Sequence, residues 1–200
     1  MQSIELCINL FALVLFLLSL CLFCFTAPDT VTMEDSASFL LSGNFLGVAH
    51  PPGYPLYTIL AKLFTLIPVS TVAYRIHLLN CLLGSMSVVV VYLLSVRLTL
   101  NESISFFVGI VLALSASFWF QAITAEVYML NTFLFLLLLL LALRLEKDFS
   151  KRDWLFFSCV YGISLSNHWP LLFLSSPGFA VLFWNRRMEI LRLTPVSLVA

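Results

Sequence analysis

Few side chains in this chain of 200 residues are of types that bind a polar substrate or move a proton, and most stand near the ends of long apolar runs. They are Glu34, Asp35, His50, Tyr54, Arg75, Glu126, Asn167 and His168. Carboxylates and imidazoles accept or donate protons, and guanidinium groups bind anions. If the fold gathers these residues, they would suit acid–base chemistry on a polar or anionic substrate.

Each of these residues also has a purely structural interpretation. Glu34–Asp35 would be a solvated acidic pair, and Arg75 an anchor whose guanidinium reaches the membrane surface. Glu126 would stabilise a helix N-terminus through the helix dipole. Asn167–His168 would satisfy backbone groups at the end of a span. No single position decides between the two interpretations, so the elements that position these residues must be considered.

The composition indicates an integral membrane protein. Hydrophobic residues make up 62% of the chain and charged residues only 10%, and the mean hydropathy is +1.06. Soluble proteins carry about a quarter charged residues, so repeated apolar runs of roughly 20 residues predict an all-α, polytopic membrane protein. Ten Lys+Arg balance ten Asp+Glu, which leaves no basic surface for a nucleic acid.

The five cysteines predict neither a disulfide nor a zinc site. Cys7, Cys21, Cys24, Cys81 and Cys159 all lie within apolar runs, where thiols behave as small hydrophobic groups. No further metal ligands surround the C-x-x-C spacing of Cys21 and Cys24, so packing is the favoured interpretation.

Six apolar runs are long enough, or nearly so, to cross a bilayer. They cover about 6–25, 76–96, 104–120, 127–143, 154–166 and 171–184. The first lacks the basic region and cleavage site of a secretory signal, so it is expected to remain as an anchor helix. We expect a single transmembrane domain over 1–200, with an outer loop at 26–74 and a helical bundle at 75–184.

The cations predict the orientation, because Lys and Arg near span ends prefer the cytoplasm. A cytoplasmic N-terminus places eight of the ten cations inside. They are Arg97, Arg144, Lys147, Lys151, Arg152, Arg186, Arg187 and Arg192. Lys62 and Arg75 remain with the long outer segment.

The outer segment contains most of the turn-forming residues. His50-Pro51-Pro52-Gly53-Tyr54-Pro55 predicts a stiff corner, since the prolines fix the backbone and Gly53 permits a turn. Residues 56–67 are apolar but too short to cross, which predicts an interfacial or re-entrant helix ended by Pro68. The topology brings this segment to the same membrane side as Glu126 and Asn167–His168.

The predicted spans carry no Asp, Glu, Lys or Arg near their middles, where a transporter would hold its coupling groups. His77 and Asn80, one turn apart in the second span, predict hydrogen bonds between helices. A site at the membrane surface is therefore favoured over a transport pathway, and a transporter is the weakest alternative.

The same residues carry a resemblance to a known family. The matching segments are Asp35-Ser36, Leu46–Tyr57 with its HPPGYP core, Ala73–Arg75, Leu78–Asn80, Ala125–Tyr128, Leu130-Asn131, Gly162 and Asn167-His168. From about Thr30 to Trp184 the chain resembles the transmembrane-protein-260-like family of protein O-mannosyltransferases and their bacterial relatives, formerly a domain of unknown function. Through that family it is similar to the C-type glycosyltransferase superfamily.

The resemblance implies an enzyme that moves a mannose-like sugar, with inversion, from a polyprenyl-phosphate donor to a protein or glycan hydroxyl on the outer or luminal face. Asp35 would be the general base, and the phosphate leaving group would need charge stabilisation rather than a general acid. No cofactor is implied, and a metal is not required. The substrate-binding residues would be His50, Tyr54, Arg75, Glu126, Asn167 and His168. The partners would be the lipid-linked donor, the acceptor and membrane lipid.

Two departures from the family support an alternative function. Relatives commonly read Asp-Ser-Gly-Glu, whereas Ala37-Ser38 follow Asp35-Ser36 here, so a second carboxylate is missing and Glu34 replaces its charge but not its position. Relatives also continue through further spans, so these residues would be the N-terminal part of a longer architecture. The alternative is a truncated or degenerate, non-catalytic scaffold or assembly subunit. The expected location is the bacterial inner (plasma) membrane.

Overall fold

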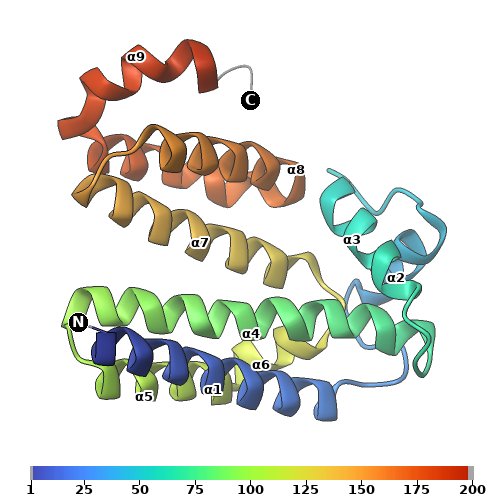
Figure 1. Ribbon diagram of the computed structural model, residues 1–200. Coiled ribbons are helices and arrows are strands. Elements are labelled where there is room, and N and C mark those ends of the chain that lie inside the picture. The colour runs from blue at the N-terminus through green and yellow to red at the C-terminus, as the bar shows by residue number, and fades with distance from the viewer. Residues whose placement is uncertain (1, 198–200) are drawn as a thin grey trace.

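The computed structural model describes residues 2–197, with side chains from 8 to 193, and all its regular elements are helices (Figure 1). They are α1 (Gln2–Thr26), α2 (Ser36–Phe45), α3 (Pro55–Thr65), α4 (Val72–Thr99), α5 (Glu102–Leu114), α6 (Ala116–Ile123), α7 (Val127–Lys147), α8 (Lys151–Leu182), the short 3-10 helix η1 (Trp184–Arg186) and α9 (Arg187–Ser197). The prediction of an all-α protein is confirmed.

The helix α4 forms the centre of the bundle and packs against α1, α5, α6 and α7 (Figure 1). Its apolar residues supply much of the core, and Ile76 and Val88 are fully buried. Gly84 lets α6 approach closely, because a Cβ there would lie only 2.8 Å from the Cβ of Ala122. The centre of α4 is therefore tightly packed against its neighbours.

Within the described part of the chain, three helices are long and apolar enough to cross a membrane: Ile8–Thr26 of α1, α4 and α7. The sequence predicted an unbroken span over 104–120, but the chain bends there by 64° between α5 and α6. The extended backbone of Ser115 (φ −64°, ψ 125°) ends α5. After the bend, α6 packs against α4. The bent pair makes a fourth span if it crosses as one.

The last two predicted spans belong to α8, whose backbone leaves helical geometry at His168 (φ −132°, ψ 82°). Pro170 follows two residues later and cannot donate the hydrogen bond that would continue the helix. The chain reverses there, because Trp154 near the start packs against Phe183 just beyond the end, with ring centroids 5.5 Å apart. The two antiparallel arms are not among the candidate spans, so the prediction of six crossings is confirmed only in part.

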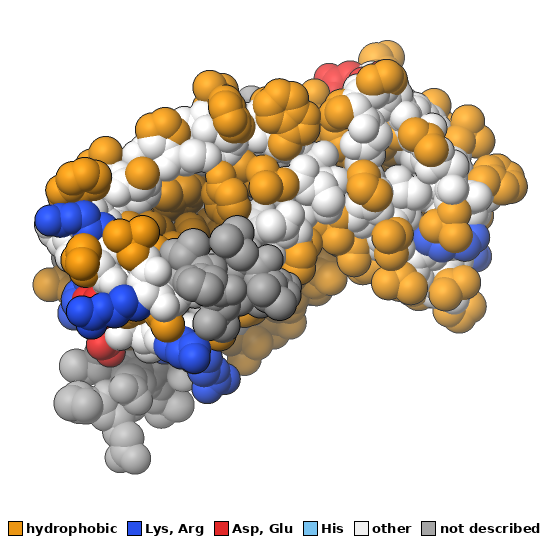
Figure 2. Space-filling model, turned by 90° about the horizontal axis from the view of Figure 1, so that it is seen from above, with side chains coloured by type: hydrophobic (Ala, Val, Ile, Leu, Met, Phe, Trp, Pro, Cys, Tyr) orange, Lys and Arg blue, Asp and Glu red, His pale blue; other side chains and the backbone are white. Residues whose placement is uncertain are grey.

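Most of the cations lie at one end of the helical bundle. The α4–α5 and α7–α8 connections and α9 lie at one end, while α2, α3 and the reversal of α8 lie at the other (Figure 1). Most of the Lys and Arg side chains visible in Figure 2 lie at one end, and a smaller group lies at the opposite end. We call the first end the cationic end (the eight cations named above). The second is the carboxylate end (Glu34, Asp35, His50, Glu126 and His168).

The outer segment folds into α2 and α3. The predicted short helix at 56–67 is confirmed as α3, whereas α2 was not predicted, because its sequence of small polar and apolar residues has no apolar stripe. Gly43 lets α2 lie against α3, since a Cβ there would come within 2.7 Å of the Cβ of Ala61. Lys62 donates a hydrogen bond to the Asn44 carbonyl (2.6 Å) and fixes the end of α2.

The thiols of Cys21, Cys24, Cys81 and Cys159 are free. Cys7 lies outside the residues whose side chains are described. Among the described residues, no group of three or more His, Cys, Asp or Glu side chains could hold a metal ion.

Candidate functional site

Asp35 stands at the start of α2 and is held by its backbone. Its carbonyl accepts hydrogen bonds from the N–H groups of Ser38 (2.9 Å) and Phe39 (3.2 Å), and its own N–H donates to the carboxylate of Glu126. Glu34 before it has a positive φ of 65°, which is uncommon outside glycine. The Asp35 carboxylate makes no capping bond and is 63% exposed, so it is free to meet a substrate.

His50 faces Asp35 from the proline-rich corner. Its Nε2 lies 3.4 Å from Asp35 Oδ2, the separation of an ion pair rather than of a close hydrogen bond. Gly53 closes the corner by donating its N–H to the His50 carbonyl (2.9 Å), with a φ of +77° that other residues rarely adopt. The corner therefore presents the His50 imidazole to the Asp35 carboxylate.

Aromatic rings from separate elements surround His50. The buried ring of Tyr54 meets those of Phe39 and His50 edge-on, with centroids 5.4 Å away in both cases. The ring of His168 lies parallel to that of Tyr54 at 6.3 Å and contacts Tyr128 at 5.9 Å. The fold thus brings the reversal of α8 against the corner, although the two are more than a hundred residues apart in the sequence.

Glu126 is the buried carboxylate of this end, with only 1% of its surface exposed. Asn80 of α4 fixes its backbone by donating its amide to the carbonyls of Thr124 and Glu126, the latter at 2.8 Å. The Asn80 oxygen in turn accepts a hydrogen bond from the Tyr57 hydroxyl (3.0 Å). This network holds the extended connection between α6 and α7 in place, so the Glu126 side chain projects from a fixed position.

The electrostatics of this end favour a neutral Glu126. Burial and, to a smaller extent, the negative charges of Asp35 and Glu34 raise its pKa from 4.5 to about 7. The N–H of Asp35 and the charge of His50 oppose that increase. Glu126 therefore exchanges its proton near neutral pH.

Two predicted site residues are occupied by structural contacts. Arg75 donates to the carbonyls of Thr65 (3.1 Å), Val69 (2.6 Å) and Ser70 (3.0 Å), so its guanidinium closes the α3–α4 connection and is not brought to Asp35. Asn167 donates its amide to the carbonyl of Val127 (3.2 Å) at the start of α7. The Asn167 contact fits its structural interpretation, whereas Arg75 supports a loop rather than acting as the expected membrane-surface anchor.

Several buried polar atoms at the carboxylate end have no hydrogen-bond partner among the described residues. They include Ser36 Oγ, His50 Nε2, Thr124 Oγ1, Glu126 Oε1, Asn167 Oδ1 and His168 Nδ1. Buried polar atoms are nearly always paired in folded proteins. A polar ligand bound here would supply the missing partners.

The sequence did not identify every residue that builds this end. Tyr57, Tyr128 and Phe39 were not singled out, and Asn80 was expected only to join helices. Tyr57 lies one turn after Tyr54, and Asn80 is an amide in an apolar run. Both positions therefore gave a weak indication that they belong to the site. The aromatic contacts of Tyr128 and Phe39 depend on the reversal of α8 and on the unpredicted α2.

Comparisons with known proteins agree with these observations. Residues 35–191 match the family described as the N-terminal domain of the protein O-mannosyl-transferase TMEM260. The chain is 36% identical over 132 residues to the protein O-mannosyl-transferase TMEM260 of Mus musculus, which covers 66% of this chain and 19% of the mouse protein. It is 28% identical over 130 residues to that of Dictyostelium discoideum, which covers 64% of this chain and 16% of that protein. No solved structure matches.

The chain therefore spans less than a fifth of the length of these relatives. The family match nevertheless contains every residue of the carboxylate end except Glu34, together with most of the helices. The resemblance identified from the sequence is confirmed. The chain belongs to the family of the protein O-mannosyl-transferase TMEM260 N-terminal domain.

Proposed function

We propose that this chain forms the catalytic end of a membrane glycosyltransferase, which moves a mannose-like sugar from a polyprenyl phosphate to a protein or glycan hydroxyl. The mouse and Dictyostelium relatives are named as protein O-mannosyl-transferases, which supports the transfer of a mannose-like sugar. The observation that carries the proposal is the exposed Asp35 carboxylate 3.4 Å from His50, beside buried polar atoms without protein partners.

In this proposal Asp35 is the general base. It takes the proton of the acceptor hydroxyl as that oxygen forms a bond to the anomeric carbon. The bond from the anomeric carbon to the phosphate oxygen breaks on the opposite face, so the anomeric configuration inverts. His50 donates a hydrogen bond to the departing phosphate, which leaves as an anion and needs no general acid.

The other groups of the carboxylate end bind the sugar. The rings of Tyr54 and Tyr128 offer apolar faces, while Glu126 Oε1, Asn167 Oδ1 and His168 Nδ1 are available to sugar hydroxyls. Arg75 supports the loop instead of the phosphate, because its guanidinium already serves three carbonyls.

The proposal also specifies the membrane arrangement. The bent pair α5–α6 and the two arms of α8 complete six crossings with α1, α4 and α7. The N-terminus is cytoplasmic, the carboxylate end faces the opposite compartment and α3 lies at the interface. The positions of the eight cations support this orientation.

Sugar transfer by the full-length protein in membranes, from a radiolabelled polyprenyl-phosphate mannose, tests the proposal. Asp35→Asn removes the proton acceptor but keeps its size, so the rate per folded protein should fall about 100- to 10,000-fold. Glu34→Gln is the matched control and should retain most activity.

Transfer that survives Asp35→Asn would refute the assignment of the base. If the folded full-length protein transfers no sugar, the result favours the non-catalytic scaffold, an alternative supported by Ala37-Ser38 where relatives carry a second carboxylate.

A further inference from the structure

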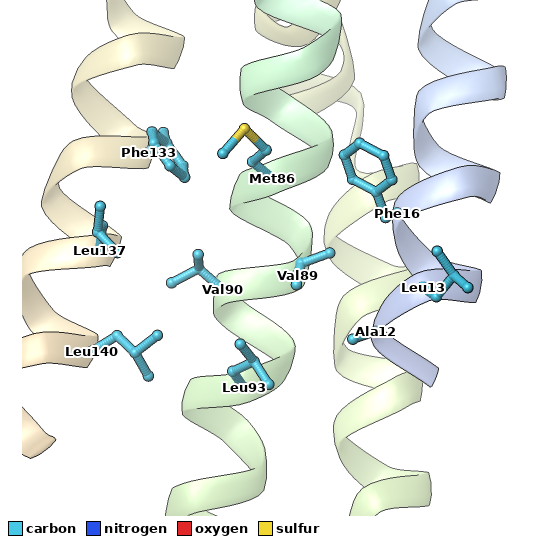
Figure 3. A pocket seen from close by; sticks show the side chains of 10 residues that line it. All are labelled: Ala12, Leu13, Phe16, Met86, Val89, Val90, Leu93, Phe133, Leu137 and Leu140. Atoms are coloured by element: carbon cyan, nitrogen blue, oxygen red, sulfur yellow. The ribbon is translucent and has the colours of Figure 1, made fainter. Parts of the chain in front are cut away.

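Two pockets follow one another along the groove between α4 and α7. The first has a volume of about 510 Å³ and is lined only by apolar side chains of α1, α4 and α7 (Figure 3). The second has a volume of about 430 Å³ and lies where α4 and α7 end, at the cationic end. Both helices run toward that end, so the two pockets lie on the same pair of helices in the same order (Figure 1).

On each of the two helices, one row of side chains runs from the first pocket into the second. Successive residues of the row are four, three and four positions apart. The rows are Met86, Val90, Leu93 and Arg97 on α4, and Phe133, Leu137, Leu140 and Arg144 on α7. Residues with this spacing lie on one helix face. Arg97 also donates from Nη1 to the carbonyl of Leu140 (3.2 Å), which joins the rows at the boundary between the pockets. An apolar groove therefore leads directly into a charged mouth.

Two of the three cations that line the charged mouth have no ion-pair partner among the described residues. Arg97, Arg144 and Lys147 line it, together with Glu146 and Asp148. Arg144 is paired with Asp153 (3.0 Å), but among the described residues no carboxylate lies within ion-pair distance of Arg97 or Lys147. Neighbouring cations are stabilised when an anion binds between them.

We propose that this groove binds an anionic phospholipid of the cytoplasmic leaflet, with one acyl chain in the apolar pocket and the phosphate at Arg97 and Lys147. Basic pockets between spans on the cytoplasmic side attract anionic headgroups. A soluble phosphate would fill only the charged mouth, whereas a lipid matches both pockets. The site lies at the opposite end of the bundle from Asp35 and does not depend on the proposed transfer reaction.

Native mass spectrometry of the full-length protein tests this proposal, with phosphatidylglycerol and phosphatidylcholine of identical acyl chains offered in equal amounts. One phosphatidylglycerol should be retained preferentially. Arg97→Gln combined with Lys147→Gln should weaken its retention about 10- to 30-fold, as expected from about 1 kcal/mol for each cation near the membrane surface. The matched control, Lys151→Gln with Arg152→Gln, removes two cations of the same end that do not line the pocket and should change retention less than twofold.

The apolar pocket is tested separately. Val89→Trp places a large ring in it and should lower phosphatidylglycerol retention, whereas Val111→Trp on α5, where the side chain is 69% exposed, should not. If the double variant fails to fold because the Arg97–Leu140 contact is lost, Lys147→Gln alone still tests the mouth, since its ammonium makes no hydrogen bond to the described residues.

Three results would overturn the proposal. The first is equal retention of the two lipids, or equal loss in the pocket and control variants. The second is competition by glycerophosphoglycerol as strong as that by the whole lipid, which would make the occupant a soluble phosphate. The third is displacement by polyprenyl phosphate at lower concentration than by phosphatidylglycerol, which would assign the groove to the sugar donor.

Discussion

The two ends of the helical bundle handle charge in opposite ways. At the cationic end the charged groups are exposed or pair locally, as Arg144 does with Asp153 (3.0 Å) and Arg186 with Glu189 (3.1 Å). At the carboxylate end Glu126 is almost wholly buried, and several buried polar atoms have no hydrogen-bond partner in the described part of the chain. The cationic end resembles an ordinary membrane-surface anchor. The carboxylate end instead keeps a carboxylate and other polar atoms buried, which is energetically unfavourable.

The difference indicates where function resides. Exposed ion pairs contribute about 0–1 kcal/mol, whereas removing a carboxylate from water costs several kcal/mol unless it is well paired. Irregular backbone accompanies that cost at the carboxylate end, with a left-handed Glu34 and a broken helix at His168. Such costs cluster at functional sites, where burial adjusts proton affinities.

Of the substitutions that test the difference between the two ends, Asn80→Leu should reduce the stability of the protein the most. The substitution leaves the carbonyls of Thr124 and Glu126 and the hydroxyl of Tyr57 buried without a partner, at about 1–3 kcal/mol each. We expect the yield of folded protein in detergent to fall severely. Asn9→Leu on the exposed face of α1 is the matched control and should fold normally. Equal yields of the two variants would show that the network does not support the carboxylate end.

An intermediate effect is expected from Glu126→Gln, measured as melting temperature against pH. The pKa of Glu126 is raised from 4.5 to about 7 by folding, so the folded state binds the proton more tightly than the unfolded state. The stabilisation is complete below pH 4.5 and is lost as the pH rises through about 7. Above pH 7 the glutamine variant should therefore melt a few degrees higher than the wild type.

The exposed Glu146 provides the control for this experiment, since Glu146→Gln should leave the pH dependence unchanged. If Glu126→Gln keeps the wild-type dependence between pH 5 and pH 8, Glu126 does not titrate in that range and the two ends differ less than the structure indicates.

The smallest effect should come from Asp153→Asn at the cationic end. It removes one surface ion pair, so the free energy of unfolding should change by less than about 1 kcal/mol. Raising the salt concentration should shrink the difference further, because exposed charges are screened. A loss of stability as large as that of Asn80→Leu would reverse the ranking of the two ends.

The sequence predicts the long helices well because apolar length is a local property. It places α4 and α7 within a few residues of their observed bounds, and the gap between its last two predicted spans, 154–166 and 171–184, falls at the break in α8. It does not predict the bend at Ser115, which depends on how α6 packs beneath α4 at Gly84. It also misses α2, whose stability depends on contact with α3 rather than on its own pattern.

The sequence predicts the candidate site less completely. Counting crossings was enough to place Asp35, His50, Glu126 and His168 at one end. The burial of Glu126 and the support it receives from Asn80 arise where segments distant in the sequence meet. The structural role of Arg75 likewise depends on three carbonyls that no spacing rule indicates.

The most direct test of this account is the sidedness of the two ends. Val48, which is 92% exposed at the carboxylate end, and Lys151, which is exposed at the cationic end, can each be replaced by cysteine in a variant without native cysteines. A membrane-impermeant maleimide added to intact cells or sealed vesicles of known orientation should label position 48 from the non-cytoplasmic side. Position 151 should react only after permeabilisation. Labelling of position 151 in the intact system, with position 48 protected, would place the carboxylate end in the cytoplasm and contradict the account.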